Sequence, residues 1–298
     1  MNLESPASLA QVSSPRPRHL LTPANLLIVL GCAALALPTF YTVATQTWTT
    51  EQGGHGPLVL ATGLWVVWRE LRGSKLDLRP GKRAIWMPLI ALTLGLFIIA
   101  RVTGVLEIEG YAMYGSLIVA AYSLFGAAPL RALWFPLIYL AFTLPPPDTV
   151  VAFVTQPIKI AISSSAVSLL YALGYPVASS GVTIQIGQYE LLVAAACAGL
   201  NSIVTLTALC LFYVYLRHRS NVRALLVIAV AAVPVAIISN FARVITLVLI
   251  TYYFGDAVAQ GFVHDFAGLL MFSVALFSIF CIDQLATPVV VGHREASA

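Results

Sequence analysis

The fold is decided by residues 223–243, RALLVIAVAAVPVAIISNFAR, in which an arginine at each end encloses an almost unbroken apolar run. At about 1.5 Å per helical residue, this run covers about 30 Å, the thickness of the hydrocarbon layer of a membrane. The whole chain has the same character: 59% of its 298 residues are apolar, 9% are charged, and the mean hydropathy is +0.90. A soluble domain carries about 25% charged residues. The sequence therefore indicates an integral membrane protein.

Comparable apolar stretches recur along the chain, and helices are expected there because lipid offers no partner to backbone polar groups. The predicted spans are residues 24–44, 57–71, 84–102, 111–127, 129–144, 197–216, 223–243 and 264–285. We therefore expect an all-α membrane protein of about eight transmembrane helices. Its parts would be a cytoplasmic tail, five N-terminal spans, an outer segment, a transmembrane core and a second tail, over residues 1–23, 24–144, 145–196, 197–285 and 286–298.

Lysine and arginine set the orientation of these spans, because short cytoplasmic loops are rich in them. Residues 69–83 and 217–223 are strongly basic, whereas residues 45–56 and 102–110 contain no lysine or arginine. We expect the two basic segments and both termini to be cytoplasmic, and the other two to face outward, with Glu107 and Glu109 in the second. The first apolar run is expected to be retained rather than removed as a signal peptide, because its removal would break this orientation.

The outer segment has a different pattern. Residues 150–173 mix apolar and polar side chains, and a ninth span there would move residues 217–223 outside, so we expect an amphipathic helix on the outer membrane surface. Residues 181–193 alternate apolar and polar around Gly187-Gln188, which predicts a small β-hairpin. This hairpin leads directly to Cys197.

Three reactive residue types are predicted to lie at one depth near the outer face. Cys197 lies 20 residues before Arg217, and Arg243 lies 20 residues after Arg223, so each is about 30 Å from the cytoplasmic side. His264 opens the last predicted span. Each residue alone has an ordinary explanation, as an inert thiol or an interfacial anchor. Together they provide a nucleophile, an oxyanion or carboxylate holder, and a base.

Three short motifs in this order resemble the exosortases, which are multi-spanning bacterial membrane enzymes. The motifs are Ala196-Cys197-Ala198-Gly199-Leu200, Asn240-x-x-Arg243 and His264-x-x-x-Gly268. The similarity covers roughly residues 130–285, and the earlier residues match only as hydrophobic spans. Ala198 departs from the serine that family members often carry after the cysteine, and Asn201 stands near a position that is often basic.

The resemblance implies a cysteine protease or transpeptidase that cleaves a C-terminal sorting signal, of a Pro-Glu-Pro type, from secreted proteins. Cys197 would form a thioester, Arg243 would hold the oxyanion or the substrate, and His264 would carry the proton. The family also implies a bacterial inner-membrane location, an outward-facing site, a tail-anchored substrate and an unidentified acceptor.

Other polar residues near the three motifs are candidates for supporting or substrate-positioning roles: Asn240, Gly199, Asn201, Glu190 and Asp265. Asn240 is as readily explained by a hydrogen bond between helices, and acids in outer loops are usually only solvated. The sequence contains no metal-spaced cluster, phosphate-binding loop or nucleic-acid patch, so we expect no metal, cofactor or nucleic acid. A transporter or a non-enzymatic membrane assembly subunit, for example in exopolysaccharide export, is the alternative function.

Overall fold

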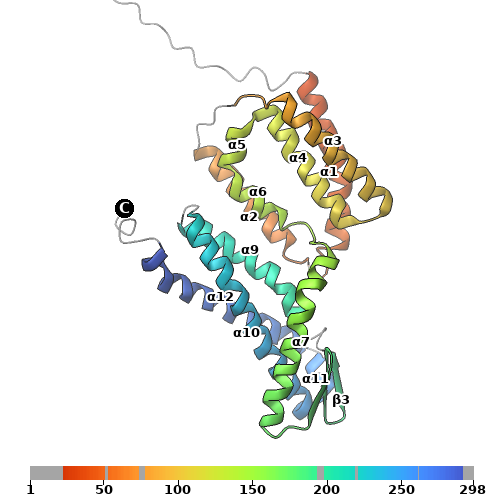
Figure 1. Cartoon of the computed structure of the whole chain (residues 1–298), viewed down its shortest axis with the longest axis vertical. Coiled ribbons are helices and arrows are strands. Elements are labelled where there is room, and N and C mark those ends of the chain that lie inside the picture. The colour runs from red at the N-terminus through yellow and green to blue at the C-terminus, as the bar shows by residue number, and fades with distance from the viewer. Residues whose placement is uncertain are drawn as a thin grey trace, which may run out of the picture.

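The computed structural model describes residues 23–50, 53–73, 78–192, 198–218, 221–260 and 262–290, and these are mostly helical. The N-terminal half forms one group of helices (Figure 1): α1 (Pro23–Gln46), α2 (Gly56–Gly73), α3 (Arg83–Thr103), α4 (Leu106–Phe125), α5 (Ala127–Ala132) and α6 (Trp134–Ala141). The C-terminal half holds α7 (Asp148–Ala172), β1 (Val177–Ser180), β2 (Thr183–Ile186), β3 (Tyr189–Leu192), α9 (Ala198–His218), α10 (Val222–Phe254), α11 (Asp256–Gln260) and α12 (Phe262–Val290).

Within the described residues, four helices are long and apolar enough to cross a membrane. They are Asn25–Gln46, Arg83–Thr103, Asp148–Ala172 and Leu226–Phe254. The chain is therefore a membrane protein with several apolar helices. The other predicted spans also coincide with helices or parts of helices, and the total of eight spans stays a prediction.

The predicted span at residues 129–144 is wrong as a single helix, because two short helices, α5 and α6, occupy this region. Gly126, at a φ of 79°, ends α4 in a conformation that favours glycine. Pro136 has no backbone N–H to bond the carbonyl one turn earlier, which favours a break between α5 and α6. Together the two helices extend from Ala127 to Ala141, about 22 Å at 1.5 Å per residue.

Helix α10 is longer than predicted, since it runs 33 residues to Phe254 instead of ending near Arg243. The sequence after Arg243, VITLVLITYYF, is again apolar and contains no helix breaker. At about 1.5 Å per residue, α10 is about 50 Å long, well above the thickness of a bilayer. Arg243 therefore lies inside a continuous helix.

Helix α7 confirms the helix predicted at residues 150–173, and it runs from the N-terminal group along the second half of α10 (Figure 1). Its length and hydropathy also suit a membrane span. Its expected position on the outer membrane surface stays a prediction.

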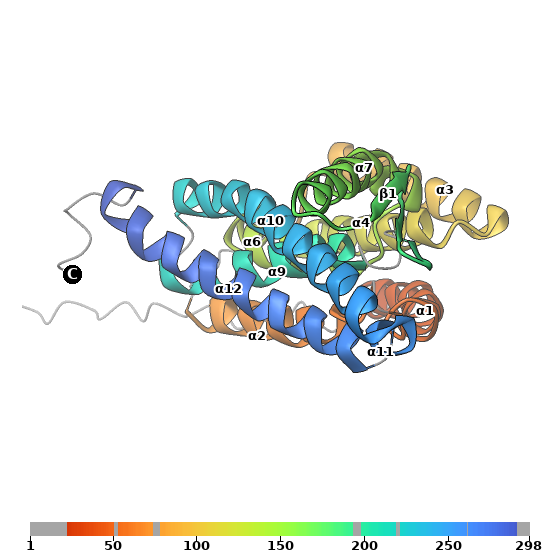
Figure 2. The same cartoon turned by 90° about the horizontal axis from the view of Figure 1, so that it is seen from below.

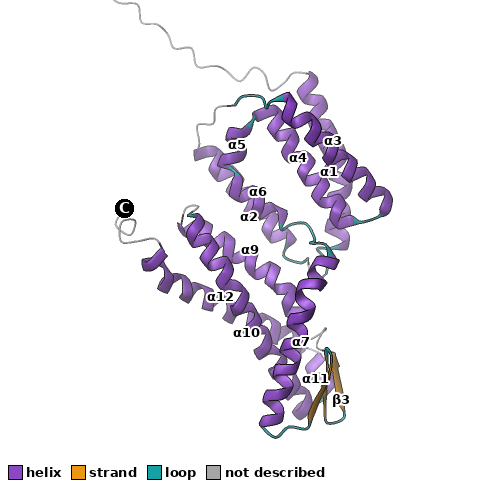
Figure 3. Cartoon of the chain, viewed as in Figure 1, coloured by secondary structure: helices purple, strands orange, loops and turns teal. Residues whose placement is uncertain are grey.

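The predicted hairpin is confirmed as β2 and β3, and β1 adds a third antiparallel strand in the order β1-β2-β3 (Figure 3). Both turns have two residues and open with a glycine at positive φ, Gly181 at 62° and Gly187 at 57°. Ile184 and Ile186 are fully buried on one face of β2. That face rests on α7 and α10, where it meets Val244 and Val248.

Candidate active site

Helices α9, α10 and α12 pack around one apolar core, and Figure 2 shows α10 and α12 side by side over most of their length. The core consists of residues spaced four apart on each helix, which is the spacing of one helix face: Leu206, Cys210 and Val214 on α9, Ile228, Ala232 and Ala236 on α10, and Ala275 and Ile279 on α12. Helix α10 carries Arg243, α12 carries His264, and α9 directly follows Cys197. These three helices are therefore neighbours in the fold.

Asn240 and Arg243 continue the same buried face of α10, since they follow Ala236 at steps of four and three residues. Their exposed fractions are 3% and 7%. Taking a guanidinium out of water within an apolar helix is costly, so such residues usually have a functional role.

Helix lengths place the start of α9 level with Arg243. The two helices are antiparallel neighbours joined at residues 219–221. At about 1.5 Å per residue, Ala198 lies about 30 Å along α9 from that connection, and Arg243 lies about 32 Å along α10 from it. Cys197 directly precedes Ala198 but lies outside the described residues. Gly199 and Asn201 are in the first turns of α9, and the side chain of Asn201 is outside the described part.

His264 and Asp265 lie in the first turn of α12, and their side chains are also outside the described part. Helices α9 and α12 run in the same direction toward a shared contact, His218 Nε2 to Asp283 Oδ1 at 2.7 Å. His264 precedes that contact by about 29 Å along its helix and Ala198 by about 30 Å. The backbone of the three helices thus brings the start of α9, Arg243 and His264 to similar heights.

Glu190, a predicted supporting residue, lies in β3 opposite Gln185, and its side chain is exposed. The neighbouring Leu191 packs in the core that also holds Val244. The sheet therefore rests on α10 one residue beyond Arg243, and the chain leaves this sheet toward α9.

Asp283 was not among the residues predicted from sequence, and it is 2% exposed and binds three side chains of α9. His218 donates to it at 2.7 Å, the Tyr213 hydroxyl donates at 2.9 Å, and Arg217 Nε pairs with it at 2.9 Å. An acid deep within the apolar run of residues 264–285, far from Asp265 at its start, is the signal that could have identified it.

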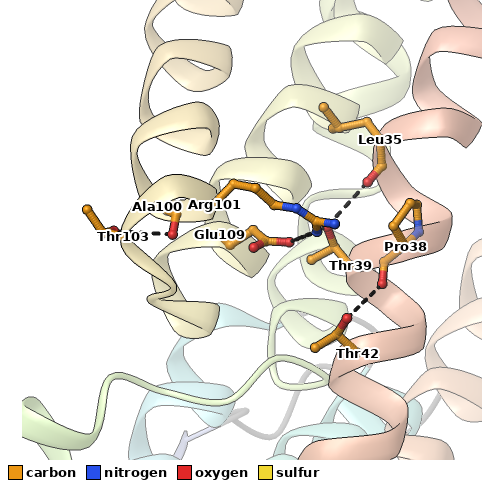
Figure 4. Close-up of polar contacts among 8 residues, drawn as sticks. All are labelled: Leu35, Pro38, Thr39, Thr42, Ala100, Arg101, Thr103 and Glu109. Atoms are coloured by element: carbon orange, nitrogen blue, oxygen red, sulfur yellow. Dashed lines mark hydrogen bonds and ion pairs between the residues drawn. The ribbon is translucent and has the colours of Figure 1, made fainter.

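Glu109 is a second buried acid, and its expected place in a loop is wrong, whereas the outward side of this segment stays a prediction. It lies in the first turn of α4 and is 5% exposed. Figure 4 shows it among α1, α3 and α4. It accepts a 2.7 Å hydrogen bond from the Thr39 hydroxyl and forms a 2.6 Å ion pair with Arg101. Arg101 lies in α3 and Thr39 in α1, two helices that were predicted as spans. The carboxylate therefore links both of them to the first turn of α4.

His55 connects the N-terminal helices to α9. Its ring lies 3.1 Å from the Phe142 carbonyl oxygen and 3.1 Å from the Thr205 hydroxyl. Thr205 is about 10 Å along α9 from Ala198. The first turns of α9 are therefore tied to the N-terminal group close to the predicted reactive level.

Comparison with known proteins identifies a family for this chain. The family model described as transmembrane exosortase matches residues 47–281. This range covers all three motifs and extends well before residue 130, where the similarity noted in the sequence began. No curated protein and no solved structure matches the chain significantly.

Proposed function

Because this chain belongs to the transmembrane exosortase family, we propose that it is a membrane cysteine transpeptidase with Cys197 as its nucleophile. The observation that carries the proposal is Arg243, a buried cation inside α10 at the height where α9 begins. The packing of α9, α10 and α12 around one core supports a site built from all three helices.

The small residues around Cys197 support its role as nucleophile. Ala196, Ala198 and Gly199 carry little or no side chain, so a substrate backbone can approach the thiol closely. Proximity to a guanidinium and an imidazolium favours the thiolate, which is the reactive form.

The proposed reaction has two acyl-transfer steps. The Cys197 thiolate attacks the peptide carbonyl carbon, and Arg243 stabilises the negative charge that develops on the carbonyl oxygen. The C–N bond then breaks, the leaving amine takes a proton from His264, and the acyl group stays on the sulfur as a thioester. An acceptor amine or water attacks the thioester, gives its proton to His264 and releases the thiolate.

The substrate class is a secreted protein held in the membrane by its own C-terminal helix, with a Pro-Glu-Pro type sorting signal beside that helix. A nucleophile at the membrane edge suits such a substrate, because its scissile bond lies at the same depth. This requires the start of α9 to face outward in a bacterial inner membrane, as the distribution of basic residues predicts. Asn240, Glu190 and Asp265 are proposed to orient Arg243 or His264.

The test is cleavage of a co-expressed tail-anchored reporter with a Pro-Glu-Pro signal, followed by gel mobility at matched membrane levels. We expect the intact protein to shorten the reporter and Cys197→Ala to abolish cleavage. Cys281→Ala is the matched control, since this half-buried thiol of α12 lies far along the helix from His264 and should not affect cleavage. Arg243→Ala and His264→Ala should each lower the rate by about a hundredfold or more.

Trapping separates the enzyme from a transporter or an assembly subunit. With the reporter present, Cys197 should carry a hydroxylamine-sensitive adduct, whereas Cys281 should not. Equal cleavage by the intact protein and Cys197→Ala would remove the nucleophile assignment. Absence of both cleavage and adduct, with the protein correctly inserted, would instead favour the non-enzymatic functions.

A further inference from the structure

Helices α1, α3 and α4 enclose a partly open cavity of about 280 Å³, in the group of helices that does not carry the proposed active site. Its walls are almost entirely apolar: they include Ile28 and Leu35 from α1, Trp86 and Leu94 from α3, and Leu117 and Val119 from α4. Helices α1 and α3 are candidate membrane spans with little buried surface, so lipid is the expected surrounding of the cavity.

The cavity has the length and depth of part of one lipid leaflet. On α3 its lining extends from Trp86 to Leu94, which is about 12 Å at 1.5 Å per residue. Half of a 30 Å hydrocarbon layer is about 15 Å. A transmembrane helix with side chains is about 10 Å across, too wide for a cavity of this volume and length. A single hydrocarbon chain fits it.

Positive charge lies at one end of the cavity. Lys82 and Arg83 are exposed and begin α3 one turn before Trp86, about 5 Å along the helix. Backbone contacts hold this end against α4, because the Gly81 amide donates to the Ser123 carbonyl at 3.2 Å and the Lys82 amide to the Tyr122 hydroxyl at 3.4 Å. Ser123 itself lines the cavity. The backbone that carries the two cations is therefore held at this end of the groove, within reach of a headgroup above a chain in it.

We propose that this groove binds an anionic phospholipid, with one acyl chain between α1, α3 and α4 and the headgroup phosphate against Lys82 and Arg83. Within a bilayer an apolar groove gains little by exchanging one hydrocarbon chain for another, so the charges decide which lipid stays. Each lysine or arginine near the membrane surface favours an anionic headgroup by about five-fold. Phosphatidylglycerol is the matching class of lipid.

The test is native mass spectrometry of the full chain in detergent, titrated with phosphatidylglycerol or phosphatidylcholine of identical chains. We expect one phosphatidylglycerol to be retained more tightly, by about 25-fold if both cations act. Lys82→Gln with Arg83→Gln should remove this preference and leave phosphatidylcholine binding unchanged. Lys159→Gln, in α7 away from the groove, is the matched charge control.

Filling the groove gives an independent readout. A Cβ atom added at Gly31, which lines the groove, has no neighbouring heavy atom within 4 Å, and the same is true at Gly95, which does not line it. Gly31→Leu should therefore lower retention of both lipids, whereas Gly95→Leu should not. If Gly31→Leu is not recovered as folded protein, Ala120→Leu fills the same groove from α4.

Three outcomes would overturn the proposal. They are equal retention of the two lipids by the unmodified chain, unchanged retention after the groove is filled, and displacement of phosphatidylglycerol by sn-glycerol 3-phosphate. The last result would indicate a site for a free phosphate ester that does not use the groove.

Discussion

Replacing Asp283 by alanine should loosen α12 from α9, because this carboxylate is the acceptor for three side chains of α9. The side chains of Asp283 and His218 are 3% and 7% exposed. Truncation therefore leaves the buried His218 ring and the half-buried Tyr213 hydroxyl without their acceptor. The third partner, Arg217, is 39% exposed and can turn toward water.

The magnitude follows from these exposures. Each of the two part-buried hydrogen bonds to the charged carboxylate contributes about 1.5 kcal/mol, and the exposed Arg217 pair contributes well under 1 kcal/mol. Hydrogen bonds between membrane helices average nearer 0.6 kcal/mol, which sets the lower limit. We expect a loss of about 3 kcal/mol, or about 6 °C in melting temperature for a chain of this size.

The assay uses Cys210, which is fully buried in the core shared by α9, α10 and α12. In a chain whose other cysteines are replaced by alanine, its reaction with a maleimide reports separation of these helices. Heating the detergent-solubilised protein should expose Cys210 about 6 °C earlier after Asp283→Ala. Asp283→Asn, which keeps the size and still accepts hydrogen bonds, should lose less than half as much.

Unchanged protection of Cys210 in Asp283→Ala would refute the reasoning, since a contact that holds the helices together cannot be removed without effect. A double-mutant cycle gives a second check. His218→Ala with Asp283→Ala should destabilise by less than the sum of the single changes, because the two residues share one interaction. Strict additivity would show that they act separately. Asp148→Ala, an exposed acid at the start of α7, should leave the transition in place.

The remaining predictions concern the N-terminal helices. Glu109→Leu should lower the free energy of unfolding by about 2 kcal/mol, because it leaves Thr39 and Arg101 without their shared acceptor. Thermal unfolding in detergent measures this loss, and a change below about 0.5 kcal/mol would contradict the prediction. Gly126→Ala should destabilise the protein far more than Gly174→Ala. Both glycines have positive φ, but only at position 126 would the added carbon overlap a backbone carbonyl oxygen, that of Arg79. Equal melting temperatures of the two variants would contradict this prediction.

The elements predicted from sequence are those with a strong local signal. The helices follow from long apolar runs, and β2 and β3 follow from alternation around Gly187-Gln188. β1, whose sequence is VASS, has no such alternation and forms because it pairs with β2. The pairing depends on the neighbour, so the local sequence could not reveal it.

Errors arose where a charged residue was used as a boundary. Arg243 was expected near the end of its span, yet the buried face of α10 continues through it. Glu109 was expected in an outer loop, yet distant residues of α1 and α3 supply its partners. A charge inside a helix is tolerated once tertiary contacts surround it, and those contacts are not encoded in the flanking residues.

For the candidate site, the sequence indicated Arg243 because residue counts place it at the same depth as Cys197 and His264. Attention to ionisable residues inside apolar runs would also have found Asp283 and its contact between α9 and α12. The height of the site could be estimated from residue counts alone, since straight helices rise uniformly. Which faces meet could not, because that depends on the packing of α9, α10 and α12.

The Asp283 contact joins α9 and α12 near their C-terminal ends, so a small rotation there displaces their N-terminal ends. These N-terminal ends, which carry the proposed reactive residues, lie about 30 Å from the contact. Each degree of rotation about Asp283 therefore shifts one tip against the other by about half an ångström. A misplacement of about 1 Å can slow catalysis a hundredfold. A rotation of about two degrees between the helices would therefore be enough to lower the catalytic rate by that factor. A carboxylate that never meets the substrate would thus govern the alignment of the groups that do.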